Sequence, residues 1–234
     1  FDQLTSQDLD HLFQGAMFMT EQHAGSDVGS IDTLAEFEDG NWFLTGDKWF
    51  CSNPDADLAM VLARHNKKIN GTKGLALFLL PKTLENGDPN NYEIIRLKDK
   101  LGGRSFASGE IRLNRAFAYI VGNPNEGFKQ MTDMINMSRL SNGVRASGMM
   151  QRCFQESLFI SNTRHAFNKK LIDLPLMQKQ LLKILIITEA SRSIVFKAAD
   201  LLNKADKGDI VSQKIFRIIT PLIKFRACRD VRKV

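Results

Sequence analysis

The character of the sequence changes near Gly122-Asn123-Pro124-Asn125, and this change limits the possible folds more than any other feature. Before it lie short apolar or alternating segments, separated by turn pairs such as Asp39-Gly40 and Asn86-Gly87, a pattern that is typical of β-strands. The segments expected to form strands are residues 16–20, 33–38, 42–45, 49–52, 58–63, 75–80, 92–97 and 109–113. Many short strands with regular turn signals predict a small barrel or sandwich.

After the change, apolar residues recur at helical spacing. The first helix is expected over residues 128–162. A second runs from Asp173 or Pro175 to about residue 204, because proline is favoured in the first turn of a helix. Gly208 ends the second helix and Asp209 caps a third. Strands followed by helices indicate an α+β chain.

The composition restricts the class of protein. The 234 residues are enough to bury a sizeable core. No apolar run is long enough for a membrane-spanning helix, and no membrane partner is expected. The three cysteines, Cys51, Cys153 and Cys228, are widely spaced, which argues against a metal site or a disulfide framework. We therefore expect an intracellular protein, cytoplasmic by default, with a mitochondrion or peroxisome as alternatives in a eukaryote. Because the chain begins Phe1-Asp2-Gln3, without Met or a leader, we expect a fragment or a processed form.

Charge is unevenly distributed along the chain. Residues 1–120 carry 12 basic and 17 acidic side chains, whereas residues 121–234 carry 20 basic and 9 acidic ones. The basic second half is suited to the phosphates of a nucleotide cofactor, of CoA or of a nucleic acid. Solvated helix faces are the alternative explanation for most of these charges.

Two polar runs follow apolar segments in the first half. The first is Thr20-Glu21-Gln22-His23-Ala24-Gly25-Ser26-Asp27, and the second is Gly46-Asp47-Lys48-Trp49-Phe50-Cys51-Ser52-Asn53. Hydroxyl side chains can donate to a heterocycle or a phosphate, glycine allows close backbone approach, and successive N–H groups can form an anion-binding nest. Aromatic rings beside these donors offer flat apolar faces. The two runs together indicate a site for a planar, phosphorylated cofactor, whereas either run alone could be an ordinary turn.

In this order and at this spacing, the two runs resemble the flavin-binding loops of the acyl-CoA dehydrogenase family. Those loops read Thr-Glu-x-x-x-Gly-Ser-Asp, and then Gly-x-Lys followed by aromatic residues and Ser or Thr. The resemblance covers essentially the whole chain and continues through residues 97–108, 125–128 and 164–168. The sequence of residues 98–108 and the later Pro175-Leu176-Met177 resemble those of one branch of the family. This branch contains the alkylation-response flavoproteins and their long-chain acyl-CoA dehydrogenase relatives.

The resemblance implies a division into three parts. Residues 1–14 are expected to be the end of an N-terminal helical domain, with the end of a helix at residues 6–13. Residues 15–122 are expected to form a small antiparallel β-barrel domain. Residues 123–234 are expected to form part of an antiparallel α-helical bundle that also builds a homo-oligomer, a dimer or a tetramer.

The resemblance also implies that the cofactor is FAD. Thr20 then donates to the pyrimidine side of the flavin ring, Ser52 lies near flavin N5 and Phe50 lies beside the ring. Gly25 and Ser26 meet the pyrophosphate. The chain departs from the family pattern in this loop, where Gln22-His23 replaces the Pro-Gly of much of the family. The resemblance adds the strand residues Met17 and Met19, and it implies that Arg164 and Phe167 reach the flavin of a neighbouring subunit. For these last two, a charge at a helix end and a core aromatic are the alternatives.

For the substrate, the resemblance implies acyl-CoA contacts from Ser26, Ser138 and Arg139. Some relatives carry the catalytic glutamate at the position of Ser138, and this chain does not. No catalytic base is therefore assigned, and the base is expected beyond Val234. The implied function is FAD-dependent α,β-dehydrogenation of an acyl-CoA thioester, with an unidentified electron acceptor, and the isolated chain is expected to be inactive. The alternatives are a flavoprotein of the DNA alkylation response, which would bind DNA through a region outside this chain, and a flavin-bearing scaffold that sequesters acyl-CoA.

Overall fold

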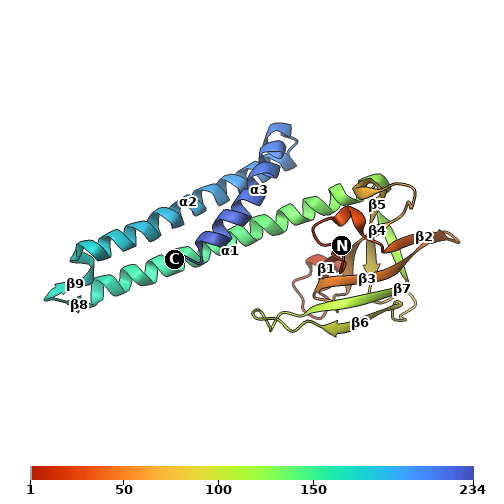
Figure 1. The fold of residues 1–234 in the computed structure, drawn as a ribbon, viewed down its shortest axis with the longest axis horizontal. Helices are drawn as coiled ribbons and strands as arrows, with labels where there is room; N and C mark the ends of the chain where they lie inside the picture. Colours follow the sequence, from red (N-terminus) through yellow and green to blue (C-terminus); the bar gives the residue numbers. More distant parts are fainter. Residues whose placement is uncertain (1) are drawn as a thin grey trace. The chain divides into compact units, whose positions relative to one another are not determined.

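The computed structural model describes residues 2–234, which form two compact units. The first extends to Thr132 and the second is Asp133–Val234. All of the long strands lie in the first unit, and the second is built from helices (Figure 1).

The first unit is built on a seven-stranded sheet. Its strands are β1 (Gly15–Phe18), β2 (Leu34–Glu38), β3 (Asn41–Ser52), β4 (Leu58–Arg64), β5 (Leu75–Pro81), β6 (Tyr92–Leu97) and β7 (Ser108–Val121). They are ordered β1-β4-β2-β3-β7-β5, with β6 on β7 and a further pairing between β4 and β5. Short 3₁₀-helices, η1 (Asp2–Thr5), η2 (Val28–Ser30), η3 (Gly71–Gly74) and η4 (Pro124–Glu126), lie before and between the strands and after β7.

The expected antiparallel barrel needs correction, because the sheet is mixed. β1 runs parallel to β4, with Gly15 opposite Leu58, and β2 meets β4 in parallel through one residue pair. The physical reason is the long connection from β1 to β2. A short turn would have made these strands an antiparallel hairpin, whereas the polar run after Phe18 carries the chain away and leaves β1 to pair with β4. The broader α+β prediction is confirmed.

Strand β3 is one long strand where the sequence predicted two. Asp39 and Gly40 both have positive φ and form the two-residue turn that the sequence predicted between β2 and β3. The register of β3 on β7 is shifted between Leu44 and Thr45 and again between Lys48 and Cys51. Gly46 adopts φ +146°, and a Cβ there would lie 2.8 Å from the Thr33 backbone, so only glycine fits at this bend.

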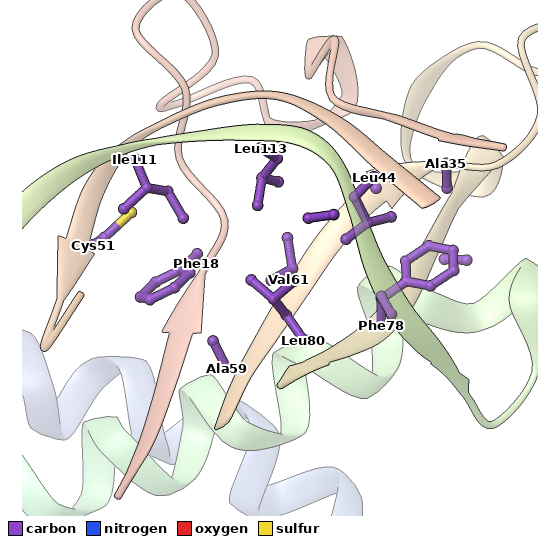
Figure 2. Close-up of a cluster of buried hydrophobic side chains, with 14 residues drawn as sticks. Phe18, Ala35, Leu44, Cys51, Ala59, Val61, Phe78, Leu80, Ile111 and Leu113 are labelled. Carbon is purple, nitrogen blue, oxygen red and sulfur yellow. The ribbon is translucent and has the colours of Figure 1, made fainter. Parts of the chain in front are cut away.

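The core of the first unit lies between the strands (Figure 2). Apolar side chains from six strands converge there, including Phe18 of β1, Leu44 of β3, Val61 of β4 and Phe78 of β5. All four are essentially inaccessible to solvent. Burying apolar surface at roughly 25 cal/mol per Å² makes this cluster the main source of stability for the sheet.

The second unit contains most of α1 (Gly127–Thr163) and all of α2 (Pro175–Asp206) and α3 (Ile210–Asp230). A small hairpin, β8 (His165–Ala166) and β9 (Lys169–Lys170), and the 3₁₀-helix η5 (Leu171–Asp173) connect α1 to α2 (Figure 1). Pro175 begins α2 as predicted. Asp209 caps α3 by accepting hydrogen bonds from the backbone N–H groups of Val211 and Ser212.

The three helices meet around a small apolar core. Leu140 of α1, Val195 and Leu201 of α2, and Phe216 and Ile223 of α3 pack together there. Gly143 makes the contact between α1 and α3 possible, because a Cβ at this position would overlap the Cγ2 methyl of Ile223. The bundle therefore depends on a missing side chain as well as on apolar ones.

Near the N-terminus the structure differs from expectation. Residues 6–13 form bends and turns in place of the expected helix end, and Phe1 lies outside the described residues. Gln14 continues this segment into β1, and its backbone N–H donates to the Asp57 carboxylate at 2.7 Å. In the described part of the chain, no helix is long and apolar enough to cross a membrane.

Candidate functional site

The two polar runs lie against each other at the ends of β1 and β3. The backbone N–H of Trp49 donates to the carbonyl oxygen of Thr20 at 2.8 Å. Thr20 follows β1, and Ser52 is the last residue of β3. The structure thus brings together two segments about thirty residues apart in the sequence, as the cofactor hypothesis requires.

A buried ion pair fastens the first run to β3. The Lys48 ammonium lies 2.8 Å from Glu21 Oε1, and the two side chains are 0% and 4% exposed. The backbone N–H groups of Asp32 and Thr33 donate to the same carboxylate at 2.7 and 3.0 Å, and the Thr33 hydroxyl donates at 2.5 Å. Because each buried charge has close partners, the desolvation cost of the pair is offset, and both ends of the loop between Glu21 and Thr33 are fixed.

Burial and charge pairing act in opposite directions on this pair. Burial alone would raise the pKa of Glu21, but the Lys48 ammonium and the hydrogen bonds from Thr33 and Asp32 outweigh it and hold that pKa below its ordinary value. Burial lowers the pKa of Lys48, and the Glu21 carboxylate opposes that shift. Because the pKa of Glu21 is lowered, its carboxylate stays ionised at neutral pH.

The loop at Gly25 and Ser26 presents backbone donors to solvent. Both residues are exposed, and among residues 2–234 their backbone N–H groups have no protein acceptor. Asp27 turns the chain into η2 by accepting from the Gly29 N–H at 3.1 Å. Arg64 fixes the far side of the loop through a bond from Nη2 to the Gly29 carbonyl at 2.6 Å. Free N–H groups on a loop held at both ends are suited to an anion such as a phosphate.

The residues expected around the flavin have hydroxyl groups that are free to form hydrogen bonds with a ligand. In the described chain, the hydroxyls of Thr20, Ser26 and Ser52 make no side-chain hydrogen bond to another protein group. Phe50, two residues before Ser52, is 56% exposed although it is a large apolar ring. Unpaired hydroxyls beside an exposed aromatic ring fit a planar heterocycle with polar edges, so these residues are compatible with a flavin.

The two predicted methionines lie at the same strand end. Met17 and Met19 are half-buried and flank Phe18, whose ring points into the core. Because side chains alternate along a strand, Met17 faces away from that core. The carbonyl of Met19 lies 3.4 Å from the Lys48 ammonium, which links it to the buried pair.

Ser138 and Arg139 lie within α1. Arg139 is half-buried, and its Nη1 donates to the side-chain oxygen of Asn136 at 3.0 Å. Ser138 is exposed. A cavity of about 390 Å³ opens beside this turn, lined by Met134, Asn136 and Met137 of α1 and by residues of α2 and α3. The Arg139 guanidinium is therefore held on the same helical turn as a cavity with a mixed polar and apolar lining.

Arg164 and Phe167 lie at the opposite end of α1. Arg164 follows the last helical turn, and Phe167 and Asn168 form the tip of the β8–β9 hairpin. Phe167 is 88% exposed and has φ +54°, an unfavourable backbone conformation for an aromatic residue. At about 1.5 Å per residue, Arg139 and Arg164 are roughly 37 Å apart along α1. The structure therefore does not bring these two predicted residues into one site within a single copy of this unit.

Comparison with known families matches both halves of the chain. The sequence profile of the acyl-CoA dehydrogenase middle domain matches residues 16–116, and that of the acyl-CoA dehydrogenase C-terminal domain matches residues 125–234. The chain belongs to the acyl-CoA dehydrogenase family. This family consists of flavoprotein oxidoreductases that act on the CH–CH bond of acyl-CoA thioesters.

Two curated relatives are each 35% identical to the chain. Acyl-CoA dehydrogenase family member 11 of Caenorhabditis elegans matches over 97% of this chain and 38% of its own length, and the putative acyl-CoA dehydrogenase AidB of Escherichia coli over 91% and 38%. The crystal structure of C. elegans ACDH-11 in complex with C11-CoA superposes with a TM-score of 0.86 at 34% identity, covering 98% of this chain and 40% of that one. The chain thus spans about two fifths of the length of these relatives.

Sequence reasoning did not assign a role to Glu21 and Lys48. Both residues lie inside the two recognised runs, but a carboxylate and an ammonium 27 positions apart give no signal of pairing. A buried lysine is rare unless it is paired, so only its burial reveals the contact. Among residues 2–234, no group of three or more His, Cys, Asp or Glu side chains is placed to hold a metal ion.

Proposed function

We propose that this chain forms the cofactor- and substrate-binding part of an enzyme that dehydrogenates acyl-CoA thioesters between Cα and Cβ with FAD. The observation that carries the proposal is the strand-end site, where the unpaired hydroxyls of Thr20, Ser26 and Ser52 and the exposed Phe50 ring lie on two chain segments that a buried ion pair joins. Family membership supplies the reaction class.

In this proposal each part of the site has one task. Thr20 and Ser52 donate hydrogen bonds to the flavin ring, and Phe50, Met17 and Met19 pack beside it. The N–H groups of Gly25 and Ser26 bind the pyrophosphate, because free backbone donors stabilise phosphate charge. The flavin held by these residues would supply the acceptor for the β-hydride of the substrate. The protein holds the ring in place and excludes water from it.

The substrate residues have different chemistry. Ser26 and the Arg139 guanidinium bind oxygen atoms of acyl-CoA, and Ser138 lies beside Arg139 without a carboxylate to act as base. We propose that a glutamate outside this chain removes the α-proton, since none of the assigned site residues is a carboxylate. A medium-to-long acyl chain agrees with the C11-CoA bound to the C. elegans relative.

We also propose that the cofactor site is completed by oligomerisation. Arg164 and Phe167 lie roughly 37 Å along α1 from the substrate residue Arg139, so within one copy of the bundle they do not share its site. A second copy could supply them, with Arg164 pairing with pyrophosphate and Phe167 packing near the adenosine. The proposed parts remain the end of an N-terminal domain at residues 1–14, a middle domain at 15–122 and an incomplete bundle at 123–234.

The test is the visible spectrum of the full-length protein under anaerobic conditions, before and after addition of a long-chain acyl-CoA. We expect a flavin absorption band that bleaches as the substrate is oxidised. A band that persists with every acyl chain length would contradict the dehydrogenase proposal. A well-folded oligomer with no flavin would contradict the cofactor assignments of Thr20, Ser26 and Ser52 together.

The second candidate is a flavoprotein of the DNA alkylation response. Two observations favour it: the 35% identity to AidB and the excess of 11 basic side chains in residues 121–234. DNA binding by such a surface should weaken steeply with salt, because phosphate contacts release counterions. A mobility-shift titration of the full-length protein at two salt concentrations tests this, and absence of binding at low salt would exclude it.

A further inference from the structure

One cationic side chain lies against the aromatic end of β3. The Lys98 ammonium is 3.6 Å from the centroid of the Trp49 ring and 4.3 Å from that of Phe50. The two rings stand edge to face, at 87° with centroids 6.4 Å apart, so one ammonium contacts both. Such contacts are strongest where the cation is shielded from water, and the Lys98 side chain is only 11% exposed.

Glu110 holds Lys98 in this position. Its carboxylate Oε1 accepts from Lys98 Nζ at 2.7 Å and from Arg96 Nη2 at 2.9 Å. Pairing of β6 with β7 places Arg96 directly opposite Glu110. Hydrogen bonds from Arg96, and then from Lys98, keep the pKa of Glu110 below its ordinary value, which overcomes the opposing effect of burial. The carboxylate therefore stays charged and holds the ammonium in place.

The group carries a net positive charge. Two cations share one carboxylate, and they differ in their exposure to water. The Arg96 side chain is 63% exposed, so solvent screens its charge, whereas Lys98 and Glu110 are nearly covered. The charge of Lys98 lies against the Phe50 ring, which is itself exposed to solvent.

We propose that Lys98 is a positioning residue that orients the Phe50 ring and places a positive charge behind it, so that the site binds the reduced form of a planar redox cofactor more tightly than the oxidised form. This inference rests on the proposed function, because it takes Phe50 to lie beside a flavin. Reduction adds electrons to the ring, and a fixed positive charge nearby stabilises the electron-rich state.

The experiment uses the full-length protein with the substitution Lys98→Met, which keeps an unbranched side chain one atom shorter and removes its charge. We measure the dissociation constants of oxidised and reduced FAD and the reduction potential of the bound flavin. We expect the substitution to weaken the binding of reduced FAD about tenfold more than the binding of oxidised FAD. This difference corresponds to a reduction potential about 30 mV lower than in the wild type for a two-electron couple. Equal weakening of the two forms, or no change in either, would overturn the role of the charge.

Three further variants separate charge from packing. Lys98→Arg should restore most of the preference for reduced FAD, because it keeps the cation. Glu110→Gln should move the ratio of the two dissociation constants in the opposite direction, because it removes the compensating negative charge. Arg96→Met is the matched control. Arg96 pairs with the same carboxylate, but its guanidinium is exposed and lies 5.7 Å from the centroid of the Trp49 ring, farther than the Lys98 ammonium. This variant should therefore change the ratio of the two dissociation constants less than twofold. An Arg96→Met shift as large as that of Lys98→Met would contradict the proposal.

A measurement without flavin separates this inference from the proposed function. Aromatic ring currents should shift the side-chain protons of Lys98 upfield in the NMR spectrum of the flavin-free protein, and Trp49→Leu should remove most of that shift. Unshifted Lys98 resonances would overturn the positioning role. If the shift is present but the wild-type protein binds no flavin, the proposed function fails and the tuning role fails with it, while the contact itself stands.

Discussion

At the scale of single residues, the buried pair of Glu21 and Lys48 connects the sequence to the site. Each charge by itself would be costly in the interior. Together they form an ion pair, and the Glu21 carboxylate also accepts hydrogen bonds from the N–H groups of Asp32 and Thr33. The pair fixes where Thr20 lies relative to Trp49. A local electrostatic contact thus determines the geometry of a loop that carries the proposed cofactor donors.

Removal of one member of this pair should be more harmful than removal of both. Lys48→Met leaves the Glu21 carboxylate buried without its ammonium partner, which we expect to cost about 3–5 kcal/mol of unfolding free energy. The double variant Glu21→Gln with Lys48→Met should lose clearly less, because no charge stays buried. Urea unfolding monitored by Trp fluorescence measures both. Equal losses for the single and the double variant would contradict this account.

The same pair predicts how stability depends on pH. Because the pKa of Glu21 is lowered in the folded protein, its contribution is fully present above its ordinary pKa of 4.5 and is lost as the pH falls through the lower folded-state value. Wild type should therefore exceed Glu21→Gln in unfolding free energy at pH 7, and the difference should shrink below about pH 4.5. Denaturant titrations at several pH values test this, and a difference that does not change with pH would refute it.

At the scale of elements, the crossing of α1 and α3 depends on Gly143. Glycine normally destabilises a helix by roughly 0.5–1 kcal/mol relative to alanine. Here the absence of a side chain lets the Ile223 methyl approach the backbone. Helix propensity and packing therefore favour opposite residues at this position, and close packing decides between them.

Two alanine substitutions on the same helix should have opposite effects. Gly143→Ala should destabilise the protein by about 1–3 kcal/mol, since the new methyl overpacks against Ile223. Gly148→Ala should stabilise it by about 0.5–1 kcal/mol, because no atom lies within 4 Å of the new Cβ. Thermal and urea unfolding measure the change in unfolding free energy for each variant relative to the wild type. A stabilising Gly143→Ala would mean that α3 moves aside without cost.

At the scale of the whole molecule, the β8–β9 hairpin presents an aromatic side chain that has no partner in the described chain beyond its own turn. Phe167 adopts a positive φ and is 88% exposed, and both features oppose stability in an isolated chain. A strained and exposed aromatic ring is readily explained if another subunit covers it. Stability of the single chain and function of the assembly then favour different residues at this position.

The substitution Phe167→Asn should separate these two demands. Asparagine tolerates the left-handed conformation, so the unfolding free energy of the variant should be about 1 kcal/mol higher than that of the wild type. In the full-length oligomer, its affinity for FAD should fall several-fold, because in the proposed assembly this ring packs against the cofactor of the neighbouring subunit. Asn168→Gly changes the adjacent turn residue without removing a ring and is the matched control. Unchanged flavin affinity in Phe167→Asn would exclude the proposed role of this residue.

The sequence by itself determined the family and most of the elements, although it divided β3 in two and predicted a helix end at residues 6–13 that is not formed. Strand and helix positions, the turn at Asp39-Gly40 and the cap at Asp209 follow from local patterns, because propensity and periodicity act over a few residues. The two polar runs were recognisable as motifs for the same reason. The parallel pairing of β1 with β4, the burial of Lys48 against Glu21, and the placement of Lys98 on Trp49 and Phe50 were decided only by the tertiary structure. These contacts join residues far apart in the chain or on different strands. Their energies depend on burial and strand register, which no local pattern encodes.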